Sequence, residues 1–551
     1  MLLPRMPAIL TRPIAGKSDP VSSYYREACR YDYRLFVRHF FNAHIYGEFS
    51  EMHDHFIDED SKSQQIRGVK RAIAAPRGNA KTTFKTLIKP IHGIVYGYES
   101  FILVIGYSGT DARDKVRDIR DELMENELLK QVYGDLIPKN AAASDFKTTT
   151  GIRVAGRSRG KAIRGIKSGK DRPSLIILDD IESLQSTNTP EQRLKTKNWF
   201  QKDVIGCCRT DKTTNIDLVG TIIHEDSLLA DLRKTPGWEG RKYRAIESFS
   251  DRQDLWDEWR KIYCDLKNIK AVKDARAFYE KNEKQMLDGV RVLWPDGDSY
   301  YSLMEFMVVN GTAAFYSEKQ NEPFDPSRQI LRPQNCSRFK VVWPWDKQWM
   351  KFFKFDSDLW THKDHGFIIS MADGFLHSSD LKKIIMAFDP AIADKEKVDY
   401  AAISVVAQDQ NDQIYLLDAW MEQKPPSVQV EAICRMQEKW ATEKLYLEAN
   451  NFQRLYKTVI NDHISNFHPN LSINIDPIIQ HKNKIGRIGT LQPYFDNNWI
   501  FLSDQLPGDY IDQIRLFPTD HDDGPDSLET AVRKLRRPRN LQTIIKTNQI
   551  V

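Results

Sequence analysis

Residues 71–82 read RAIAAPRGNAKT, a short apolar strand that runs into a loop ending in Lys81 and Thr82. The residues that follow favour a helix, with Leu87 and Ile91 on one face. Unpaired amides and the helix dipole converge at the start of such a helix, so it attracts anions. The stretch therefore predicts a phosphate-binding loop at the end of a buried strand.

The loop departs from the usual pattern G-x-x-x-x-G-K-[ST], because Ala75 and Ala80 stand where the two glycines belong. Lys81 would reach the β- and γ-phosphates of ATP, and Thr82 would hold Mg2+. The residues expected to contact the nucleotide are Arg77, Gly78, Asn79, Ala80, Lys81, Thr82 and Thr83.

A second apolar run, 175–178, is followed by the acidic residues Asp179, Asp180 and Glu182. Asp179 is expected to coordinate Mg2+ through water, and either Asp180 or Glu182 to activate the hydrolytic water. The alternative for this acidic group is an ordinary turn at a strand end.

The first half of the sequence alternates apolar strands with helices. Strands are predicted at 71–76, 101–106, 175–178 and 216–220, and a charged amphipathic helix at 111–127. This α/β pattern is typical of a mainly parallel sheet covered on both faces.

A second alternation begins at residue 383. It predicts a strand to Asp389, strands at 400–407 and 413–420, a helix, a strand to Glu448, a helix, a strand at 473–479 and a final helix. Three antiparallel strands followed by this order predict a ribonuclease H-like fold with a mixed sheet.

Acidic residues gather at the ends of these elements. Asp389 and Glu448 end strands, and HDDGPD at 521–526 opens the final helix. Carboxylates are the right ligands for Mg2+ or Mn2+, and a site with two such ions cuts phosphodiesters. The candidate ligands are Asp389, Glu448, Asp522, Asp523 and Asp526, with Asp394 and Asp399 as further candidates.

Asp523 is the favoured direct ligand within the last group, with Asp526 as its auxiliary, because residues at i and i+3 of a helix can face one ion. Either Asp522 or Asp523 is alternatively a helix N-cap beside Gly524.

Length and composition limit the possible architectures. At 551 residues the chain exceeds one hydrophobic core. We predict an N-terminal helical segment at 1–65, a phosphate-loop ATPase domain at 66–330, a linker or insertion at 331–380, a nuclease domain at 381–537 and a basic tail at 538–551.

The distribution of charge and of cysteines limits the possible ligands and the cellular compartment of the protein. The net charge is only +4, yet 153–172 and 533–539 are strongly basic, as a nucleic-acid backbone would require. Six cysteines without a C-x-x-C pair argue against a disulfide framework and a zinc site. No stretch predicts a membrane span or a signal peptide, so a cytosolic protein is expected.

The ordered motifs PRGNAKT, LIILDDIE, LVGTIIH at 218–224 and HDDGPD together resemble the large terminase subunit of tailed bacteriophages over about residues 70–535. The resemblance implies that Gly220 and Thr221 couple hydrolysis to movement. It further implies that Arg164 serves a neighbouring subunit's nucleotide, or else binds DNA phosphate, and that Lys482 and Arg487 meet the DNA backbone.

The resemblance also implies a function, cofactors, partners and a cellular location. The chain would package double-stranded DNA into a preformed capsid and cut concatemers, using ATP with Mg2+ and a nuclease with two Mg2+ or Mn2+. Its partners would be the small terminase subunit, the portal protein and further copies in a ring, a pentamer by resemblance. It would act in the host cytoplasm, transiently at the portal, and be absent from the mature virion.

Two other functions remain open from sequence. A helicase-like DNA translocase would hydrolyse ATP without cutting DNA, its second half being only structural. A non-catalytic scaffolding subunit would carry a degenerate loop, as the alanines at 75 and 80 suggest.

Overall fold

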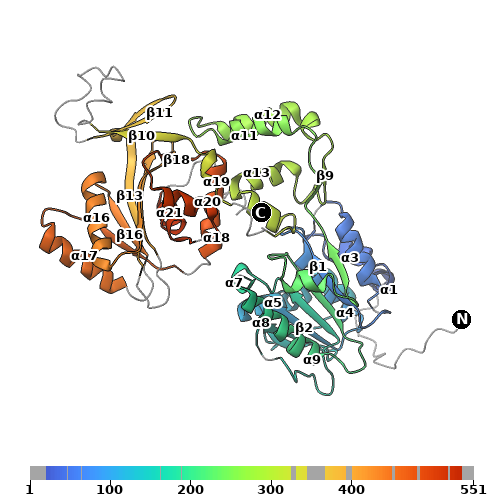
Figure 1. Ribbon diagram of the computed structural model, residues 1–551. Helices are drawn as coiled ribbons and strands as arrows, with labels where there is room; N and C mark the ends of the chain where they lie inside the picture. Colours follow the sequence, from blue (N-terminus) through green and yellow to red (C-terminus); the bar gives the residue numbers. More distant parts are fainter. Residues whose placement is uncertain are drawn as a thin grey trace. The chain divides into compact units, whose positions relative to one another are not determined.

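The computed structural model describes residues 20–45, 47–63, 65–161, 163–187, 189–323, 330–343, 366–391, 400–448, 453–480, 484–518 and 521–535 (Figure 1). It is mixed α/β with sheets rich in parallel pairs. The chain divides into two compact units. The first comprises Met1–Phe249, Gly289–Met304 and Ala314–Phe324, and the second Ser250–Asp288, Glu305–Ala313 and Asp325–Val551.

The first unit is built on a sheet with the strand order β3-β4-β2-β5-β6-β1-β7. Its pairs are parallel except β3 with β4. The strands are β1 (Lys70–Ala74), β2 (Phe101–Gly106), β3 (Asp145–Lys147), β4 (Arg153–Ser158), β5 (Leu175–Asp179), β6 (Asn215–Gly220) and β7 (Glu239–Lys242). The apolar runs predicted as strands form β1, β2, β5 and β6, with small shifts at their ends.

The helices of this unit are α1 (Pro20–Tyr31), α2 (Tyr33–Phe40), α3 (Glu51–Ser61), η1 (Thr83–Ile88), α4 (Lys89–Val95), α5 (Gly109–Glu125), α6 (Glu127–Tyr133), α7 (Leu184–Thr187), α8 (Pro190–Trp199), η2 (Phe200–Val204), α9 (Ile205–Cys207) and α10 (Leu228–Leu232). A small ribbon joins β8 (Ile246–Ser248) to β9 (Arg291–Val292).

Both faces of the sheet are buried. Along β5, Leu175 and Ile177 lie in one hydrophobic core, and Ile176 and Leu178 lie in the other. Side chains alternate between the two faces of a strand, so a strand covered on both sides must be apolar throughout. This explains why the sequence shows continuous apolar runs here.

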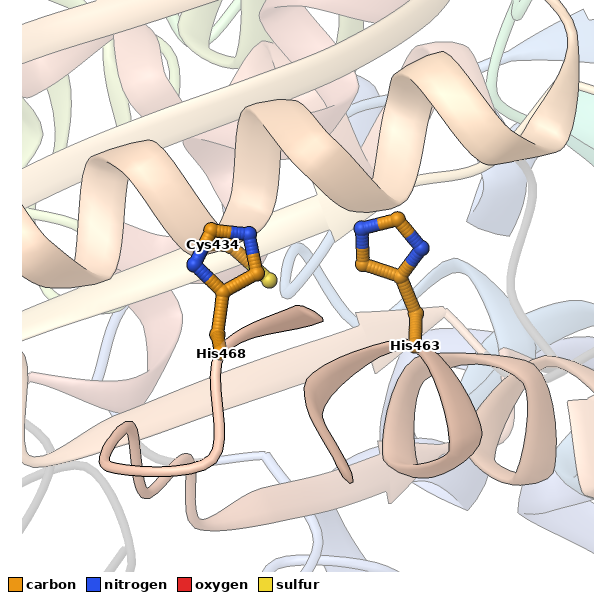
Figure 2. A group of neighbouring side chains, drawn as sticks. All are labelled: Cys434, His463 and His468. Atoms are coloured by element: carbon orange, nitrogen blue, oxygen red, sulfur yellow. The ribbon is translucent and has the colours of Figure 1, made fainter. Parts of the chain in front are cut away.

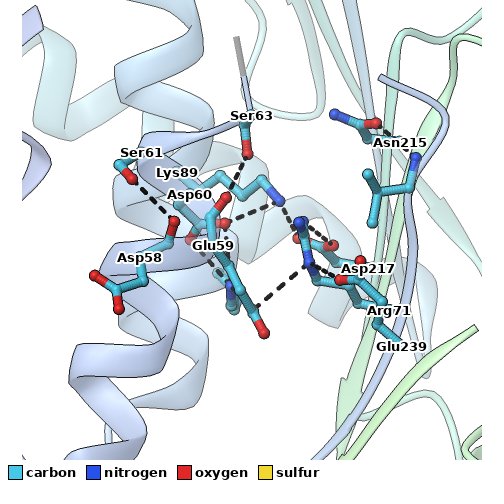
Figure 3. A network of polar contacts seen from close by, with 12 residues as sticks. Asp58, Glu59, Asp60, Ser61, Ser63, Arg71, Lys89, Asn215, Asp217 and Glu239 are labelled. Atoms are coloured by element: carbon cyan, nitrogen blue, oxygen red, sulfur yellow. Dashed lines mark hydrogen bonds and ion pairs between the residues drawn. The ribbon is translucent and has the colours of Figure 1, made fainter. Parts of the chain in front are cut away.

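A buried network of charged side chains lies beneath the phosphate-loop helix (Figure 3). Lys85 lies 3.1 Å from Glu59 and 3.0 Å from Asp60, and Lys89 pairs with Asp60 at 3.1 Å and with Asp217. The network joins α3, η1, α4 and β6, and its members are almost completely buried. It therefore fixes the helix that carries the loop against the sheet and the N-terminal helices.

The second unit is built on a sheet with the strand order β12-β11-β10-β18-β15-β14-β13-β16-β17. The strands are β10 (Arg338–Val342), β11 (Ile368–Met371), β12 (Gly374–His377), β13 (Leu381–Asp389), β14 (Ala401–Asp409), β15 (Ile414–Glu422), β16 (Lys444–Glu448), β17 (Ile475–Ile478) and β18 (Ile500–Ser503). β13, β14 and β15 are antiparallel neighbours, whereas β13, β16 and β17 pair in parallel.

Its helices are α11 (Gln253–Cys264), α12 (Ala271–Met286), η3 (Pro333–Asn335), η5 (Ser378–Asp380), α16 (Pro426–Trp440), α17 (Gln453–Phe467), α18 (Lys484–Ile488), η6 (Gly489–Leu491), α19 (Gln492–Asp496), α20 (Gly508–Leu516) and α21 (Asp523–Lys534), while α13 (Tyr300–Asn310) and α14 (Thr312–Glu318) each span a boundary between the units. Helices α16 and α17 lie on one side of β13 and β16, and α20 and α21 lie on the other (Figure 1).

Alternate side chains of each strand face opposite helical layers. Met386 and Phe388 of β13, and Leu445 and Leu447 of β16, lie in the core that includes α16 and α17. The intervening positions therefore face α21.

The region expected to be a linker or insertion, 331–380, is part of the second sheet where the structure describes it. β10 pairs with β18 in parallel, and β11 and β12 continue the edge in antiparallel pairs. These strands are only four or five residues long, so no alternation stood out in the sequence. Residues 344–365 lie outside the described residues. Residues 250–288, placed in the ATPase domain by sequence, form α11 and α12 of the second unit.

We expect Asp217→Asn to lower the free energy of unfolding of the first unit by about 3–5 kcal/mol, because the change leaves Lys89 buried without its β6 carboxylate. The matched control is Asp54→Asn in the exposed pair with Arg34, which should cost less than about 1 kcal/mol. Denaturant unfolding of both variants measures the difference. Equal losses would contradict a stabilising role for the network.

Two candidate active sites

The phosphate loop adopts a backbone that suits glycine better than alanine. Gly78 has a φ of 89° and Ala80 a φ of 55°, so the alanine occupies the left-handed region. Surrounding groups hold this conformation. Lys319 donates to the carbonyl of Arg77 at 2.9 Å, and the buried ring of His53 donates to the carbonyl of Asn79 at 3.2 Å. The alanine in place of glycine is thus accommodated by tertiary contacts.

Lys81 and Thr82 lie directly above the acidic end of β5. The Lys81 ammonium is 3.3 Å from Asp180 and is 5% exposed. Thr82 donates its hydroxyl to Asp179 at 3.2 Å. The hydroxyl and carboxylate that were predicted to share Mg2+ are therefore neighbours.

Asp179 is fully buried among donors. Thr86 donates to it at 3.0 Å, and the Lys115 ammonium lies 3.4 Å from its carboxylate. Burial raises the pKa of Asp179 above its usual value, and Lys115 and Lys81 oppose that rise. Oxygen donors at this position suit a hard divalent cation, so the residues fit a bound Mg2+-nucleotide.

Glu182 caps the start of α10. Its two carboxylate oxygens accept hydrogen bonds from the amides of Leu228 at 2.8 Å and Leu229 at 3.0 Å. Burial raises the pKa of Glu182. Of the two residues proposed to activate water, Asp180 is therefore the one that lies beside Lys81.

Gly220 lies at the end of β6, between the loop strand and the acidic strand. The amide of Ala75 donates to the carbonyl of Gly220 at 3.0 Å. A side chain added at Gly220 would approach Asp180 to 3.2 Å. The Gly220-Thr221 turn thus contacts both halves of the candidate nucleotide site.

The two candidate arginines lie at the surface. Arg77 pairs with Glu318 at 2.9 Å, and Arg164 donates to the carbonyl of Lys202 at 2.8 Å. Both side chains are more than half exposed. They can reach a partner or a nucleotide only by giving up these contacts.

A cavity of about 360 Å³ lies beside the loop helix, lined in part by Thr82, Thr83 and Lys115. Its other walls carry the carboxylates of Asp118, Asp121, Glu122 and Glu125. These carboxylates would repel phosphate, so we expect the phosphates at the loop amides and not in this cavity.

The second candidate site lies at the carboxyl ends of two adjacent strands of the second unit. β13 and β16 are parallel, with Phe388 opposite Leu447, so the next residues, Asp389 and Glu448, emerge side by side. Their positions face α21, which packs on β13 and β14. Carboxylate oxygens of Asp389, Glu448 and Asp526 lie within 4.8 Å of one another.

Lys484 occupies the middle of this acidic group and was not singled out from sequence. Its ammonium lies 2.7 Å from Asp522, 3.3 Å from Asp526, 3.6 Å from Asp523 and 3.8 Å from Asp389. Burial works against the charge, but the surrounding carboxylates raise the pKa of Lys484 above its usual value. Lys482 and Lys484 are two residues apart in the same basic stretch, so sequence alone could not show which of them enters the acidic group.

The crowding of these buried carboxylates shifts their pKa values. Burial and the neighbouring Asp526 raise the pKa of Glu448 to about 7 against the opposing charges of Arg487 and Lys484, and burial raises the pKa of Asp389 well above its usual value. A group of oxygen ligands that repel each other in this way fits Mg2+ or Mn2+.

Arg487 does not lie where a DNA contact was expected. Its guanidinium is buried and lies 2.5 Å from Asp526 and 2.7 Å from Glu529. The apolar neighbour Ile488 is buried with it, so the arginine positions Asp526 from within the fold. Lys482, Asp394, Asp399 and the basic tail at 538–551 lie outside the described residues.

Asp523 is buried at the first turn of α21, and Asp522 precedes it as the N-cap residue without a side-chain capping bond. Asp526 forms the closest group with Asp389 and Glu448, whereas Asp523 was the favoured ligand from sequence.

No protein-family model matches the sequence, and no curated protein matches it. Among solved structures, the large terminase from a thermophilic bacteriophage matches with a TM-score of 0.40 and 10% identity, covering 89% of this chain and 99% of that chain. The complex of that terminase with ATP-gamma-S matches with a TM-score of 0.40 and 9% identity, covering 88% and 99%.

The human cytomegalovirus terminase nuclease domain matches with a TM-score of 0.23 and 12% identity, covering 28% of this chain and 83% of that one. At such TM-scores and identities the function must be argued from the two sites themselves.

We expect Asp180→Asn to lower the ATP turnover number by about 10²–10⁴-fold, because its carboxylate is the one beside Lys81. Glu182→Gln should instead lower the melting temperature, since an amide cannot accept from both α10 amides. Steady-state ATPase assays and thermal unfolding of the two variants separate these effects. A larger turnover loss in Glu182→Gln would reverse the assignment.

We expect Asp526→Asn to weaken Mn2+ binding by about tenfold or more, and Asp523→Asn to weaken it less, because Asp526 lies closest to Asp389 and Glu448. Asp512→Asn, in an exposed pair with Arg515, is the control. Calorimetric titration with Mn2+ measures all three. The larger loss in Asp523→Asn would restore the ligand choice made from sequence.

Proposed function

We propose that the chain is an ATP-driven DNA-packaging enzyme that moves double-stranded DNA and cuts it, the role of a large terminase subunit. One observation carries this proposal. Two acidic sites of different design lie on separate compact units, one behind a phosphate loop and the other with carboxylates as its candidate metal ligands. A motor needs only the first site and a nuclease only the second, so a chain with both combines movement with cutting.

The first unit acts as the ATPase, with a phosphate-loop fold. Bound Mg2+-ATP supplies the phosphoryl group that is transferred to water. Lys81 exchanges Asp180 for the nucleotide phosphates and neutralises their charge, while Thr82 and Asp179 hold the cation. Asp180, released from Lys81, then orients the water.

Coupling to movement runs through β6 and α10. The Gly220-Thr221 turn contacts the loop strand and Asp180, and Glu182 holds the start of α10 directly after that turn. A change of partner at Asp180 is therefore transmitted to α10. Exposed Lys161, Lys167, Lys170 and Arg164 of the basic stretch supply the phosphate contacts.

The second unit acts as the nuclease, with a ribonuclease H-like fold. Two divalent cations, when bound, activate a water and stabilise the leaving oxygen of the phosphodiester. Asp389, Glu448 and Asp526 would hold these ions, with Asp523 and Asp522 as auxiliaries. Lys484 keeps the carboxylates together before the ions bind, and Arg487 holds Asp526 in place.

The proposed setting follows from the motif resemblance. The chain would work with a small terminase subunit and a portal protein as a ring of copies, five by resemblance. It would act in the host cytoplasm, transiently at the portal, and leave before the virion matures. Among the described helices, none is both long and apolar enough to cross a bilayer.

We expect the two activities to be lost independently. Lys81→Ala should lower ATP turnover by about 10²–10³-fold or more, because it removes the charge that stabilises the transferring phosphoryl group, and should leave plasmid cutting in Mn2+ largely intact. Asp389→Asn should abolish cutting and leave ATPase activity. ATPase and plasmid-cleavage assays of both variants test this.

The outcomes discriminate between functions. ATPase activity without cutting in the wild type would indicate a translocase with a structural second unit. Neither activity would indicate a scaffolding subunit. Normal ATPase activity in Lys81→Ala would overturn the phosphate-loop assignment.

A further inference from the structure

A second group of potential metal ligands lies on the α16–α17 face of the second unit, and it contains no aspartate. Helix α16 carries Glu431, Cys434 and Glu438 at positions i, i+3 and i+7, which place them on one face. Helix α17 brings His463, and His468 follows directly after that helix. Figure 2 shows Cys434 and the two imidazole rings gathered between the helices.

The ligand atoms converge. The sulfur of Cys434 and one nitrogen of each histidine lie within 4.8 Å of one another. The Nε2 atoms of His463 and His468 both lie 3.1 Å from the same oxygen of Glu431. Three possible ligands therefore surround one small volume, with Glu431 beside the two imidazoles.

A further carboxylate orients one ring. The Nδ1 atom of His468 lies 2.9 Å from Glu438, and its Nε2 atom is directed to Glu431. A carboxylate that holds the far nitrogen of a histidine is the usual outer partner of a metal-bound imidazole. The alternative to a metal site is a hydrogen-bonded cluster in which Glu431 bridges the two histidines. Such a cluster does not need the buried thiol of Cys434 beside it.

The set of ligands selects a metal class. One thiolate and two imidazoles suit zinc and similar transition ions, whereas the oxygen ligands of Asp389, Glu448 and Asp526 suit Mg2+ or Mn2+. The spacing His463-x₄-His468 is also that of many zinc sites. The sequence shows no C-x-x-C pair to point to this group, because its cysteine lies one helix earlier.

We propose that Cys434, His463 and His468 bind a zinc-class ion that fastens α17 to α16. This site goes beyond the proposed function and is separate from the nuclease cluster. Cys434 is fully buried, while the two imidazoles and Glu431 are partly exposed, so the ion enters from the solvent side. The thiol gives its proton to solvent as the ion binds, and no redox step is involved.

The site would have a structural purpose. Helix α17 follows the strand that ends at Glu448, and α16 packs against β14. An ion shared by the two helices would hold them together over the sheet edge that carries the nuclease carboxylates. Its loss would loosen that edge without touching a catalytic group.

Cobalt substitution in the full-length chain tests the proposal. We expect one equivalent of Co2+ to give a thiolate-to-cobalt charge-transfer band, which the nuclease carboxylates cannot produce because they contain no sulfur. The matched variants are Cys434→Ser and Cys336→Ser, the latter changing another buried cysteine of the same unit. Competition with a chromophoric chelator gives the Zn2+ affinity of each.

Cys434→Ser and His468→Gln should abolish the band or weaken Zn2+ binding by about tenfold or more, and Cys336→Ser should change neither. Protection of Cys434 from alkylation by Zn2+ in the unmodified chain gives a second readout that needs no variant to fold. Absence of the charge-transfer band in the wild type, or equal Zn2+ affinity in Cys434→Ser and wild type, would overturn the proposal and leave a hydrogen-bonded cluster only.

Discussion

Parallel strand pairing brings acidic side chains from distant parts of the chain to one sheet edge, and both candidate sites depend on it. In the first unit, β5 and β1 both pair with β6, so Asp179, Gly220 and the phosphate loop meet at that edge. In the second unit, β13 and β16 are direct parallel neighbours, so Asp389 and Glu448 emerge together. Carboxylates gathered in this way repel one another and require a cation.

Each site contains a lysine where the negative charge concentrates. Lys81 pairs with Asp180 in the first unit, and Lys484 lies among four aspartates in the second. Phosphate could take the place of Asp180 at Lys81, and metal ions could take the place of Lys484 among the carboxylates. The two units thus use the same electrostatic arrangement for different chemistry, and the buried network around Lys85 and Lys89 keeps the first one rigid.

Much of this could be predicted from sequence, for a physical reason. Strands buried on both faces give continuous apolar runs, and these placed the ends of β5, β13 and β16 and hence Asp179, Asp389 and Glu448. The orientation of individual side chains could not be predicted in the same way. Sequence does not show that the carboxylate of Glu182 accepts two hydrogen bonds from α10. Asp523 and Asp526 lie on the same turn of α21, so sequence does not show which of them lies nearer to Asp389 and Glu448.

Contacts between segments far apart in sequence could not be predicted either. Arg487 looked like a surface base, but its partner Glu529 lies 42 residues away and, with Asp526, buries it. The described strands of 331–380 are short and separated, so their membership of the second sheet shows only in pairing with β18. The Cys434 group likewise combines two helices whose adjacency no local pattern records.

The most direct test of the two-site account is a crystal structure of the chain with a non-hydrolysable ATP analogue and Mn2+, with the anomalous signal of manganese recorded. The account predicts phosphates at the amides of residues 78–82 with one ion between Thr82 and Asp179, and separate manganese density among Asp389, Glu448 and Asp526. A nucleotide bound elsewhere, or no anomalous density among the three carboxylates, would contradict it.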